Sequence, residues 1–420
     1  MSKLVVFILA AFLTQAAWAG ETASYPDLPP APQVQAVLLE HPNVLAARAG
    51  IHAGEAARDR LRAGVHETNV RLGAQQRSDP AQRFNEWDVG LERAVRLPGK
   101  AGMDRKLGEG ELTRSRVMYG DALHETGRGL LKAWFAWGRE NAAAAQWREQ
   151  VAALKEQLEI VGKRVKAGDA PKLEAGLAEA ALAGAENALH QATLKEQVAA
   201  NELLQGYAGI TLPEKLPVLQ PVALAQGLEQ WREEILKHSH ELAVARNEAQ
   251  MARMQGERAD AERIPDPALG LRAASERGGS EHIVGVSISI PFSGAARSAR
   301  AAETLAHAEA AAQREAAVLR KIRLEAANTF AAAQAAYRGW ESATVASDKM
   351  RANTELMSRA YALGEMSLSD VLLARRQSLE SGLAATLARL EAAESRYRLL
   401  LDAHRLWPLD ADDDEGHAHY

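Results

Sequence analysis

The stretch ALGEMSLSDVLLARR runs from Ala362 to Arg376 and interrupts a long helical pattern for only a few residues. The pattern pauses at Gly364 and resumes at Leu368, and a similar pause occurs earlier, in VKAGDAPKLEAGLAEA from Val165 to Ala180. Glycine relieves the backbone where a helix must end and the chain must reverse. Each pause therefore predicts the tip of a helical hairpin, the first at Gly168 and the second at Gly364.

The two pauses belong to a duplication of the whole chain. Gly168 and Gly364 lie 196 residues apart, and LLEHPNVLAARA at Leu38 resembles ILKHSHELAVAR at Ile235 with a separation of 197 residues. A nearly constant separation indicates two tandem copies of one structural unit. We expect the first repeat at residues 20–220 and the second at residues 221–407.

Within each repeat the hydrophobic period changes from helix to strand and back to helix. Residues 32–64 and 228–263 have helical patterns, and alternating segments such as Val284-Gly285-Val286-Ser287 follow them. A period of two residues predicts strands with one apolar and one polar face. The next pattern, from Ala101 to Ala167, would reach roughly 100 Å as an unbroken helix. The predicted β-hairpins span about residues 68–96 and 267–292.

The N-terminal residues and the composition of the chain indicate an exported protein. Residues 1–19, MSKLVVFILAAFLTQAAWA, are typical of a secretory signal peptide that is cleaved before Gly20. The chain has no cysteine, and its net charge of −5 comes from interspersed charges without a basic block typical of nucleic-acid binding. No nucleophile–base constellation or nucleotide fingerprint is present. We expect an exported, mainly α-helical protein that is not an enzyme and needs no cofactor.

The predicted strands have the length and the two unlike faces of transmembrane barrel strands. A small soluble sheet packed on the helices is the alternative, but the helices are too long and too polar to bury it. Four strands cannot close a barrel, and open edges are not tolerated in lipid, so the chain must self-associate. Two copies would give eight strands and three would give twelve. Four charged residues on the polar strand faces are expected to face the lumen: Arg71, Asp88, Glu92 and Arg272.

Over its whole mature length the chain resembles the TolC-type outer-membrane efflux protein family, through its duplication, its two strands per repeat and its two tip segments. The resemblance implies a mainly α fold with a small β part: a duplicated α-helical hairpin barrel with four transmembrane β-strands per protomer, completed as a homotrimer. It also implies a passive duct in the outer membrane with a long periplasmic extension. Its partners would be a periplasmic adaptor (membrane fusion) protein and an inner-membrane efflux pump.

The sequence RLPGKAG, from Arg96 to Gly102, is similar to the CzcC-like subgroup. That subgroup serves heavy-metal pumps of the resistance–nodulation–division type, so heavy-metal cations are the expected cargo. Multidrug and type I secretion channels share the architecture and are alternatives. A soluble periplasmic coiled-coil adaptor or scaffold is the alternative from a different class.

The resemblance also assigns roles to the two tip glycines and to one acid. It implies that Gly168 and Gly364 dock the hairpin of the adaptor, and a plain turn without a partner is the alternative. It implies that Asp370 forms a ring of carboxylates that constricts the channel entrance and attracts cations. The alternative for Asp370 is a solvated residue that the dipole of the following helix stabilises.

A polar latch between neighbouring tips is the last feature that the resemblance implies. Tyr361 matches the tyrosine of this latch, and Glu174 matches its acidic partner. The arginine of the family is replaced by Met366. We therefore expect a gate that Tyr361 and Glu174 hold, and that is looser than in the multidrug members.

The C-terminal residues 408–420 combine several acids with His417 and His419. A His-x-His pair beside acids could hold Zn²⁺ or Co²⁺ loosely. We prefer the alternative of a disordered, solvated tail. No other metal site is predicted.

Overall fold

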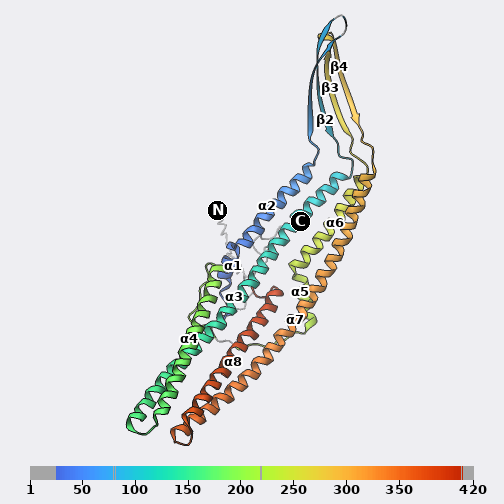
Figure 1. The fold of residues 1–420 in the computed structure, drawn as a ribbon. Helices are drawn as coiled ribbons and strands as arrows, with labels where there is room; N and C mark the ends of the chain where they lie inside the picture. The colour runs from blue at the N-terminus through green and yellow to red at the C-terminus, as the bar shows by residue number, and fades with distance from the viewer. Residues whose placement is uncertain (1–24, 79, 81, 218–219, 408, 410–420) are drawn as a thin grey trace, which may run out of the picture.

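The computed structural model describes residues 25–78, 80, 82–217, 220–407 and 409. The predicted signal peptide, residues 1–19, and the tail histidines His417 and His419 lie outside these residues. Figure 1 shows an elongated molecule with a narrow sheet at one end and two helical hairpin tips at the other.

The elements follow the same order in each half of the chain. The first half contains α1 (Ala31–Glu40), α2 (Pro42–Ala63), β1 (Thr68–Ser78), β2 (Arg83–Ala94), α3 (Lys100–Ala167) and α4 (Lys172–Gly206). The second half contains α5 (Leu228–His238), α6 (His240–Ala261), β3 (Ala268–Glu276), η1 (Arg277–Gly279), β4 (Glu281–Ser289), α7 (Ala295–Ala362) and α8 (Leu368–Asp402). A mainly helical chain with a small four-stranded sheet confirms the predicted fold class.

The first helix of each half is divided in two, which differs from the prediction. The sequence predicts one helix over residues 32–64, but His41 is extended and its Nδ1 accepts a hydrogen bond from the backbone of Asn43 at 3.2 Å. Pro42 suits the first position of α2 because a helix leaves that N–H unpaired. In the second half, the Ser239 hydroxyl accepts a hydrogen bond from the third residue of α6 at 3.2 Å. Local capping therefore interrupts a continuous hydrophobic pattern.

The four strands form one antiparallel sheet in the order β1-β2-β3-β4. Leu72 pairs with Val89, and Leu271 pairs with both Leu91 and Val286, so the pairing continues from the first half into the second. β1 and β4 each have only one neighbouring strand in this chain. The sheet therefore has two edges whose backbone groups can pair with another chain.

One face of the sheet is apolar and exposed. Leu72 is 75% exposed, Val286 is 77% exposed, and Trp87 on the same face is 51% exposed. Strand alternation places the other apolar residues of this face with them: Val70, Val89, Leu91, Leu269, Leu271, Val284 and Ile288. A contiguous exposed apolar face of this size marks a surface that contacts lipid or protein.

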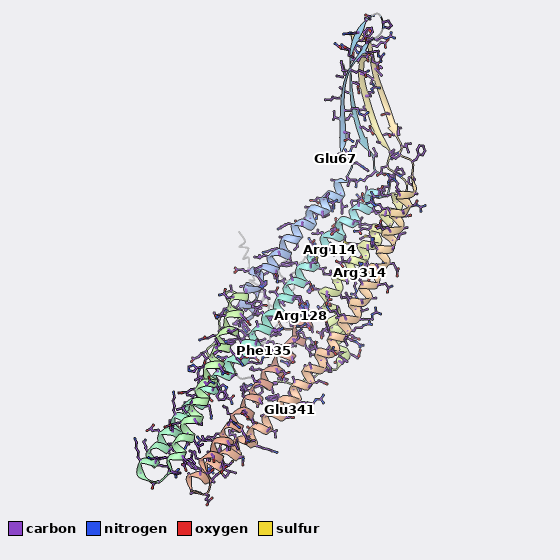
Figure 2. The ribbon with its side chains drawn as sticks, viewed as in Figure 1. Glu67, Arg114, Arg128, Phe135, Arg314 and Glu341 are labelled. Atoms are coloured by element: carbon purple, nitrogen blue, oxygen red, sulfur yellow. The ribbon has the colours of Figure 1, made fainter. Side chains whose placement is uncertain are left out.

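The main hydrophobic core lies in the middle of the helical part. Figure 2 shows Phe135 there, whereas Glu67 lies at the junction with the sheet. Phe135 is fully buried, and the neighbouring Trp134 donates a hydrogen bond from Nε1 to the backbone oxygen of Asp27 at 2.8 Å. The Tyr397 hydroxyl donates to Oδ1 of the same Asp27 at 2.6 Å. These bonds hold the N-terminal segment against α3 and α8.

Smaller clusters continue the packing from this core toward the tips. Val151 and Leu154 of α3 pack against Ala185 of α4, and Val161 packs against Ala178 of α4 and against the start of α8. Small residues on α4 let the paired helices approach closely. Among the described residues, every helix is too short or too polar for a membrane crossing.

Candidate functional site: hairpin tips and sheet

The two tips end their first helices with the same backbone hydrogen bonds. At the first tip, Gly168 has φ 81°, and the N–H of Asp169 donates to the carbonyl oxygen of Arg164 at 2.8 Å. At the second tip, Gly364 has φ 79°, and the N–H of Glu365 donates to a carbonyl oxygen of the last turn of α7 at 2.9 Å. A Cβ atom added to either glycine would meet open space. The left-handed backbone, and not crowding, is what favours glycine here.

The two hairpins of one protomer are joined at their tips by a polar cluster. The Tyr361 hydroxyl, from α7, donates a hydrogen bond to Oε2 of Glu174, from α4, at 2.7 Å. Arg164, from α3, donates from Nη1 to the Tyr361 oxygen at 2.6 Å, and its guanidinium carbon lies 5.1 Å from the centre of the tyrosine ring. Burial and the hydrogen bond to Glu174 raise the pKa of Tyr361, so the phenol keeps the proton that it donates.

The structure thus brings together Tyr361 and Glu174, which the sequence paired, and adds a residue that sequence reasoning missed. Arg164 supplies a guanidinium to this cluster, whereas Met366 stands where the resemblance led us to expect an arginine. The duplication gives no signal for it, because the matching position before Gly364 is Ala360; the available signal is that Arg164 lies in the last turn of α3, four residues before Gly168. That signal is weak alone, because a basic residue in the last turn of a helix is common for its effect on the helix dipole.

Asp370 occupies a different environment, although it lies 196 residues after Glu174. It is the third residue of α8, and Ser367 is the N-cap. The Ser367 hydroxyl donates to Oδ2 of Asp370 at 2.6 Å, and the backbone N–H of Asp370 donates to that hydroxyl oxygen at 3.3 Å. The carboxylate is exposed and completes a reciprocal cap at a helix N-terminus.

The four charged strand residues named from the sequence share one face of the sheet. Arg71 and Arg272 both pair with Gly90, from opposite sides, and Asp88 pairs with Gly73. A side chain at Gly73 would collide with the Asp88 carboxylate, so this glycine makes room for it. The fourth residue of the set, Glu92, follows on the same face of β2.

A charged cluster at the hairpin end of this face was not found from the sequence. Glu86 has only 2% of its side chain exposed, and the Arg77 guanidinium lies 3.2 Å from its Oε1. Gln75 donates to Oε2 of Glu86 at 2.8 Å, and the backbone N–H of Arg277 donates to Oε1 at 3.2 Å. The cluster fastens η1 to the polar face of β2. Cross-strand partners of this kind depend on the register, which the sequence alone does not fix.

The charged residues of RLPGKAG bind protein groups at the junction of sheet and helices. Lys100 is 3% exposed, and its Nζ donates to Oδ1 of Asp266 and to the carbonyl oxygen of Ile264, each at 2.7 Å. Arg96 donates to the carbonyl oxygen of Arg62 at 2.9 Å. The motif therefore ties the connection after β2 to the one before β3 and to the end of α2.

Histidines gather at one place in the helical core. The His404 ring lies 5.1 Å from the ring of His124, 5.1 Å from that of His238 and 5.0 Å from that of His240, measured between ring centres. Even so, within residues 25–409 as far as they are described, no group of three or more histidine or acidic side chains has the geometry to hold a metal ion.

An exposed apolar sheet face and a charged opposite face are the two unlike faces that strands of a transmembrane β-barrel present. Comparison with solved structures agrees. The outer membrane channel CmeC of Campylobacter jejuni superposes with a TM-score of 0.73 and 14% identity, covering 90% of this chain and 85% of that chain. The outer membrane protein VceC of Vibrio cholerae gives a TM-score of 0.73 and 16% identity, covering 90% and 99%.

The MtrE outer membrane channel of Neisseria gonorrhoeae, in its open state, gives a TM-score of 0.69 and 17% identity, covering 90% of this chain and 89% of that chain. No family model matches the sequence, and no curated protein matches it significantly. The chain therefore has the fold of the TolC-like outer-membrane channels. The resemblance inferred from the sequence is confirmed as a resemblance of fold.

Proposed function

We propose that this chain is the outer-membrane channel of an efflux system, a passive duct with its sheet in the outer membrane and its helices extending into the periplasm. The observation that carries the proposal is the exposed apolar face of the sheet. Leu72 of the edge strand β1 and Val286 of the edge strand β4 lie on this face, and both are about three-quarters exposed. Lipid is the environment that makes such a face favourable, and the opposite face then lines a polar lumen.

The two sheet edges support self-association. β1 and β4 each have one unpaired edge in this chain, and unpaired backbone groups are costly in a bilayer. Three protomers, joined β4 to β1, would close a barrel of twelve strands, and a homotrimer is the state we propose. In that barrel Arg71, Asp88, Glu92 and Arg272 would face the lumen, because they share the polar face.

The tips are the proposed contact with the other components. The α3–α4 and α7–α8 connections, which contain Gly168 and Gly364, lie at the end of the molecule farthest from the sheet, where a duct would meet a periplasmic adaptor protein (Figure 1). An inner-membrane pump, of the resistance–nodulation–division type, would supply the energy. The cluster of Tyr361, Glu174 and Arg164 would hold the tips in the closed arrangement, and Asp370 would add a carboxylate to each protomer's share of the entrance.

We further propose heavy-metal cations as the cargo, on the resemblance of RLPGKAG to the CzcC-like subgroup. The charged side chains of that sequence bind backbone and carboxylate groups at the junction, so they act on the architecture of the duct and not on the cargo. Multidrug export and protein secretion are the competing cargo classes. The apolar sheet face opposes the alternative of a soluble periplasmic adaptor, because water would cover it in such a protein.

Two measurements test the proposal. First, cysteine pairs introduced on the polar faces of the two edge strands, Arg71→Cys with Gly285→Cys, Ser287→Cys or Ser289→Cys, should give disulfide-linked trimers in isolated outer membranes. The chain has no cysteine of its own, so each cross-link is unambiguous. A chain that stays monomeric in detergent, or that dissolves without detergent, would contradict the channel.

Second, cells that depend on this chain for the outer-membrane step should accumulate Zn²⁺ and Co²⁺ when it is deleted, as measured by elemental analysis. Accumulation of a drug or retention of a secreted protein in place of the metals would assign the cargo to one of the competing classes. Either of those results leaves the duct itself intact.

A further inference from the structure

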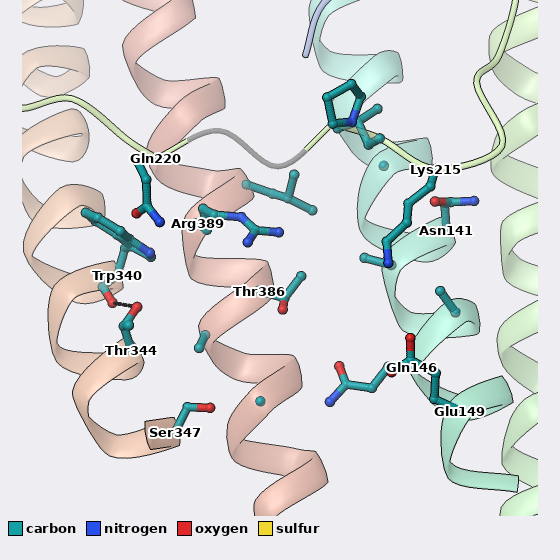
Figure 3. A pocket seen from close by; sticks show the side chains of 18 of the residues that line it. Asn141, Gln146, Glu149, Lys215, Gln220, Trp340, Thr344, Ser347, Thr386 and Arg389 are labelled. Atoms are coloured by element: carbon teal, nitrogen blue, oxygen red, sulfur yellow. Dashed lines mark hydrogen bonds between the residues drawn. The ribbon is translucent and has the colours of Figure 1, made fainter. Parts of the chain in front are cut away.

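A cavity of about 430 Å³ lies between the two helical hairpins, beneath the segment that connects α4 to α5. α3 forms one wall, α7 and α8 form the other, and Lys215 and Gln220 of the connecting segment lie over it (Figure 3). The volume is in the range of small-molecule sites in proteins. No residue named for the channel lines this cavity, so its chemistry needs a separate explanation.

Arg389 of α8 is the unusual group in the cavity. Its guanidinium is partly buried, and burial is the cause that lowers its pKa. Within the part of the chain that the structure describes, no carboxylate pairs with it. Burying a cation without an anion is costly, and most buried arginines avoid this cost through an ion pair. Arg389 is only partly buried, so its guanidinium is open to an anion that enters the cavity.

The surroundings of Arg389 add positive charge. Figure 3 shows the Lys215 side chain extending from the connecting segment toward the space between α8 and α3, and the Arg389 side chain extending toward the same space from the α8 side. Arg351 of α7 also lines the cavity and is paired with Asp348 at 2.6 Å. Among the described residues that line the cavity, Glu149 of α3 is the one acid. The cavity lining thus carries more positive than negative charge.

The remaining lining suits an organic molecule better than a bare inorganic ion. Trp340 of α7 and the buried Leu390 of α8 provide aromatic and apolar surface. Thr386 of α8 provides a hydroxyl group on one wall, and the Thr344 hydroxyl, which donates to the Trp340 carbonyl oxygen at 2.9 Å, can still accept a hydrogen bond. A few polar groups among apolar ones are what fixes the orientation of a small ligand.

We propose that this cavity binds a small organic anion, whose carboxylate pairs with Arg389 and whose apolar or aromatic body lies against Trp340 and Leu390. These three residues belong to the second hairpin, and α3 of the first hairpin forms the opposite wall, so a ligand that fills the cavity also reaches the first hairpin. A ligand that binds only the folded arrangement stabilises it by mass action. Binding therefore raises the temperature at which the helical part unfolds.

The test uses the full chain, purified in detergent, and the probe 2-naphthoate, with the neutral 2-naphthylmethanol as a matched compound. Titration calorimetry should show saturable binding of naphthoate and much weaker binding of the alcohol. Arg389→Gln should weaken naphthoate binding about tenfold or more, since a charged hydrogen bond is lost. Trp340→Leu should weaken it as well. Arg376→Gln, an exposed change on the same helix, is the matched control and should leave binding unchanged.

Three results would overturn the proposal: no naphthoate binding by the unaltered chain, equal binding of acid and alcohol, or unchanged binding by Arg389→Gln. If inorganic phosphate displaced naphthoate at a similar concentration, the cavity would be a site for any simple anion, and the proposal of an organic anion would be wrong. Arg389→Lys keeps the positive charge and should retain part of the affinity for naphthoate. That result would show that Arg389→Gln binds weakly because it lost the charge, and not because it failed to fold. None of these readouts depends on conduction, so the proposal and the channel function can fail independently.

Discussion

The Tyr361 hydroxyl donates a hydrogen bond to Glu174 at 2.7 Å, although the two residues lie 187 positions apart and on different hairpins. The same oxygen receives a hydrogen bond from Arg164 at 2.6 Å. The tip contact is thus made within a single protomer. An arginine from α3 provides the positive charge, so the absence of an arginine at Met366 does not leave the contact without one.

Loss of this cluster should open the duct. The combined change Tyr361→Phe and Glu174→Ala removes the hydroxyl and its acceptor, which together contribute about 1–3 kcal/mol to holding the tips. Single-channel conductance in planar bilayers should rise several-fold, and Arg164→Gln should give a smaller rise. Tyr337→Phe, on α7 but away from the tip, should conduct like the unaltered chain. Unchanged conductance in the double variant would show that these residues do not act as a latch.

The tip glycines should tolerate alanine poorly because of their backbone conformation. Gly168→Ala and Gly364→Ala place a side chain at φ near 80°, which costs about 1 kcal/mol in the left-handed region. Amide hydrogen exchange in the last turns of α3 and α7 should accelerate, and adaptor binding should weaken. Gly176→Ala is the control, since Gly176 lies inside α4 with open space around it and alanine favours helix. Equal exchange in all three variants would refute the conformational argument.

Variants of Asp370 and of its capping residue Ser367 should affect cation block differently. In a cyclic oligomer its carboxylates would attract cations, so Asp370→Ala should reduce the block of conductance by Co²⁺ or by trivalent cations added from the periplasmic side. Ser367→Ala removes the capping hydroxyl but keeps the carboxylate, and it should retain the block. If both variants lose block equally, the effect comes from the helix terminus and not from a ring of charge.

The stability of the helical part should fall with acidification because of His124. Burial, together with the nearby Arg128 guanidinium, lowers the pKa of His124 to about 3, from an ordinary value of 6.5. The unfolded chain therefore binds the extra proton first, and stability decreases as pH falls from 6.5 toward 3. The melting temperature measured between pH 7.5 and 5 should fall less in His124→Gln. His307→Gln, at an exposed site, should keep the original pH dependence.

The two faces of the sheet should respond differently to the same charge. Val286→Arg places a guanidinium on the exposed apolar face, which costs about 2–4 kcal/mol near the middle of a bilayer. Ser287→Arg, at the next residue, places it on the polar face. We expect the first variant to fold poorly into outer membranes and the second to assemble normally, as measured by heat-resistant oligomers on gels. Equal assembly would argue against lipid on the apolar face.

The sequence predicts the parts of this structure that depend on local patterns. Alternation identifies the faces of the strands, and the pauses at Gly168 and Gly364 locate the tips, because glycine is favoured where φ is positive. Arg164 was missed because its partner Tyr361 lies on another hairpin. Glu86 was missed for a similar reason, since its partners depend on strand register. The break at His41 was missed although Pro42 signals it: a proline disfavours helical backbone at the residue before it, and this outweighs the continuous apolar pattern.

The duplication leaves the two tips unequal. Glu174 and Asp370 lie at matching positions, yet Glu174 accepts a hydrogen bond from Tyr361 of the other hairpin, while Asp370 bonds Ser367 at the start of its own helix. In a ring of three such chains, six helical hairpins would surround the channel entrance, but only three Tyr361–Glu174 contacts would hold them together. Opening of all three contacts together would then widen the ring with threefold rather than sixfold symmetry, and opening of a single contact would leave the ring asymmetric.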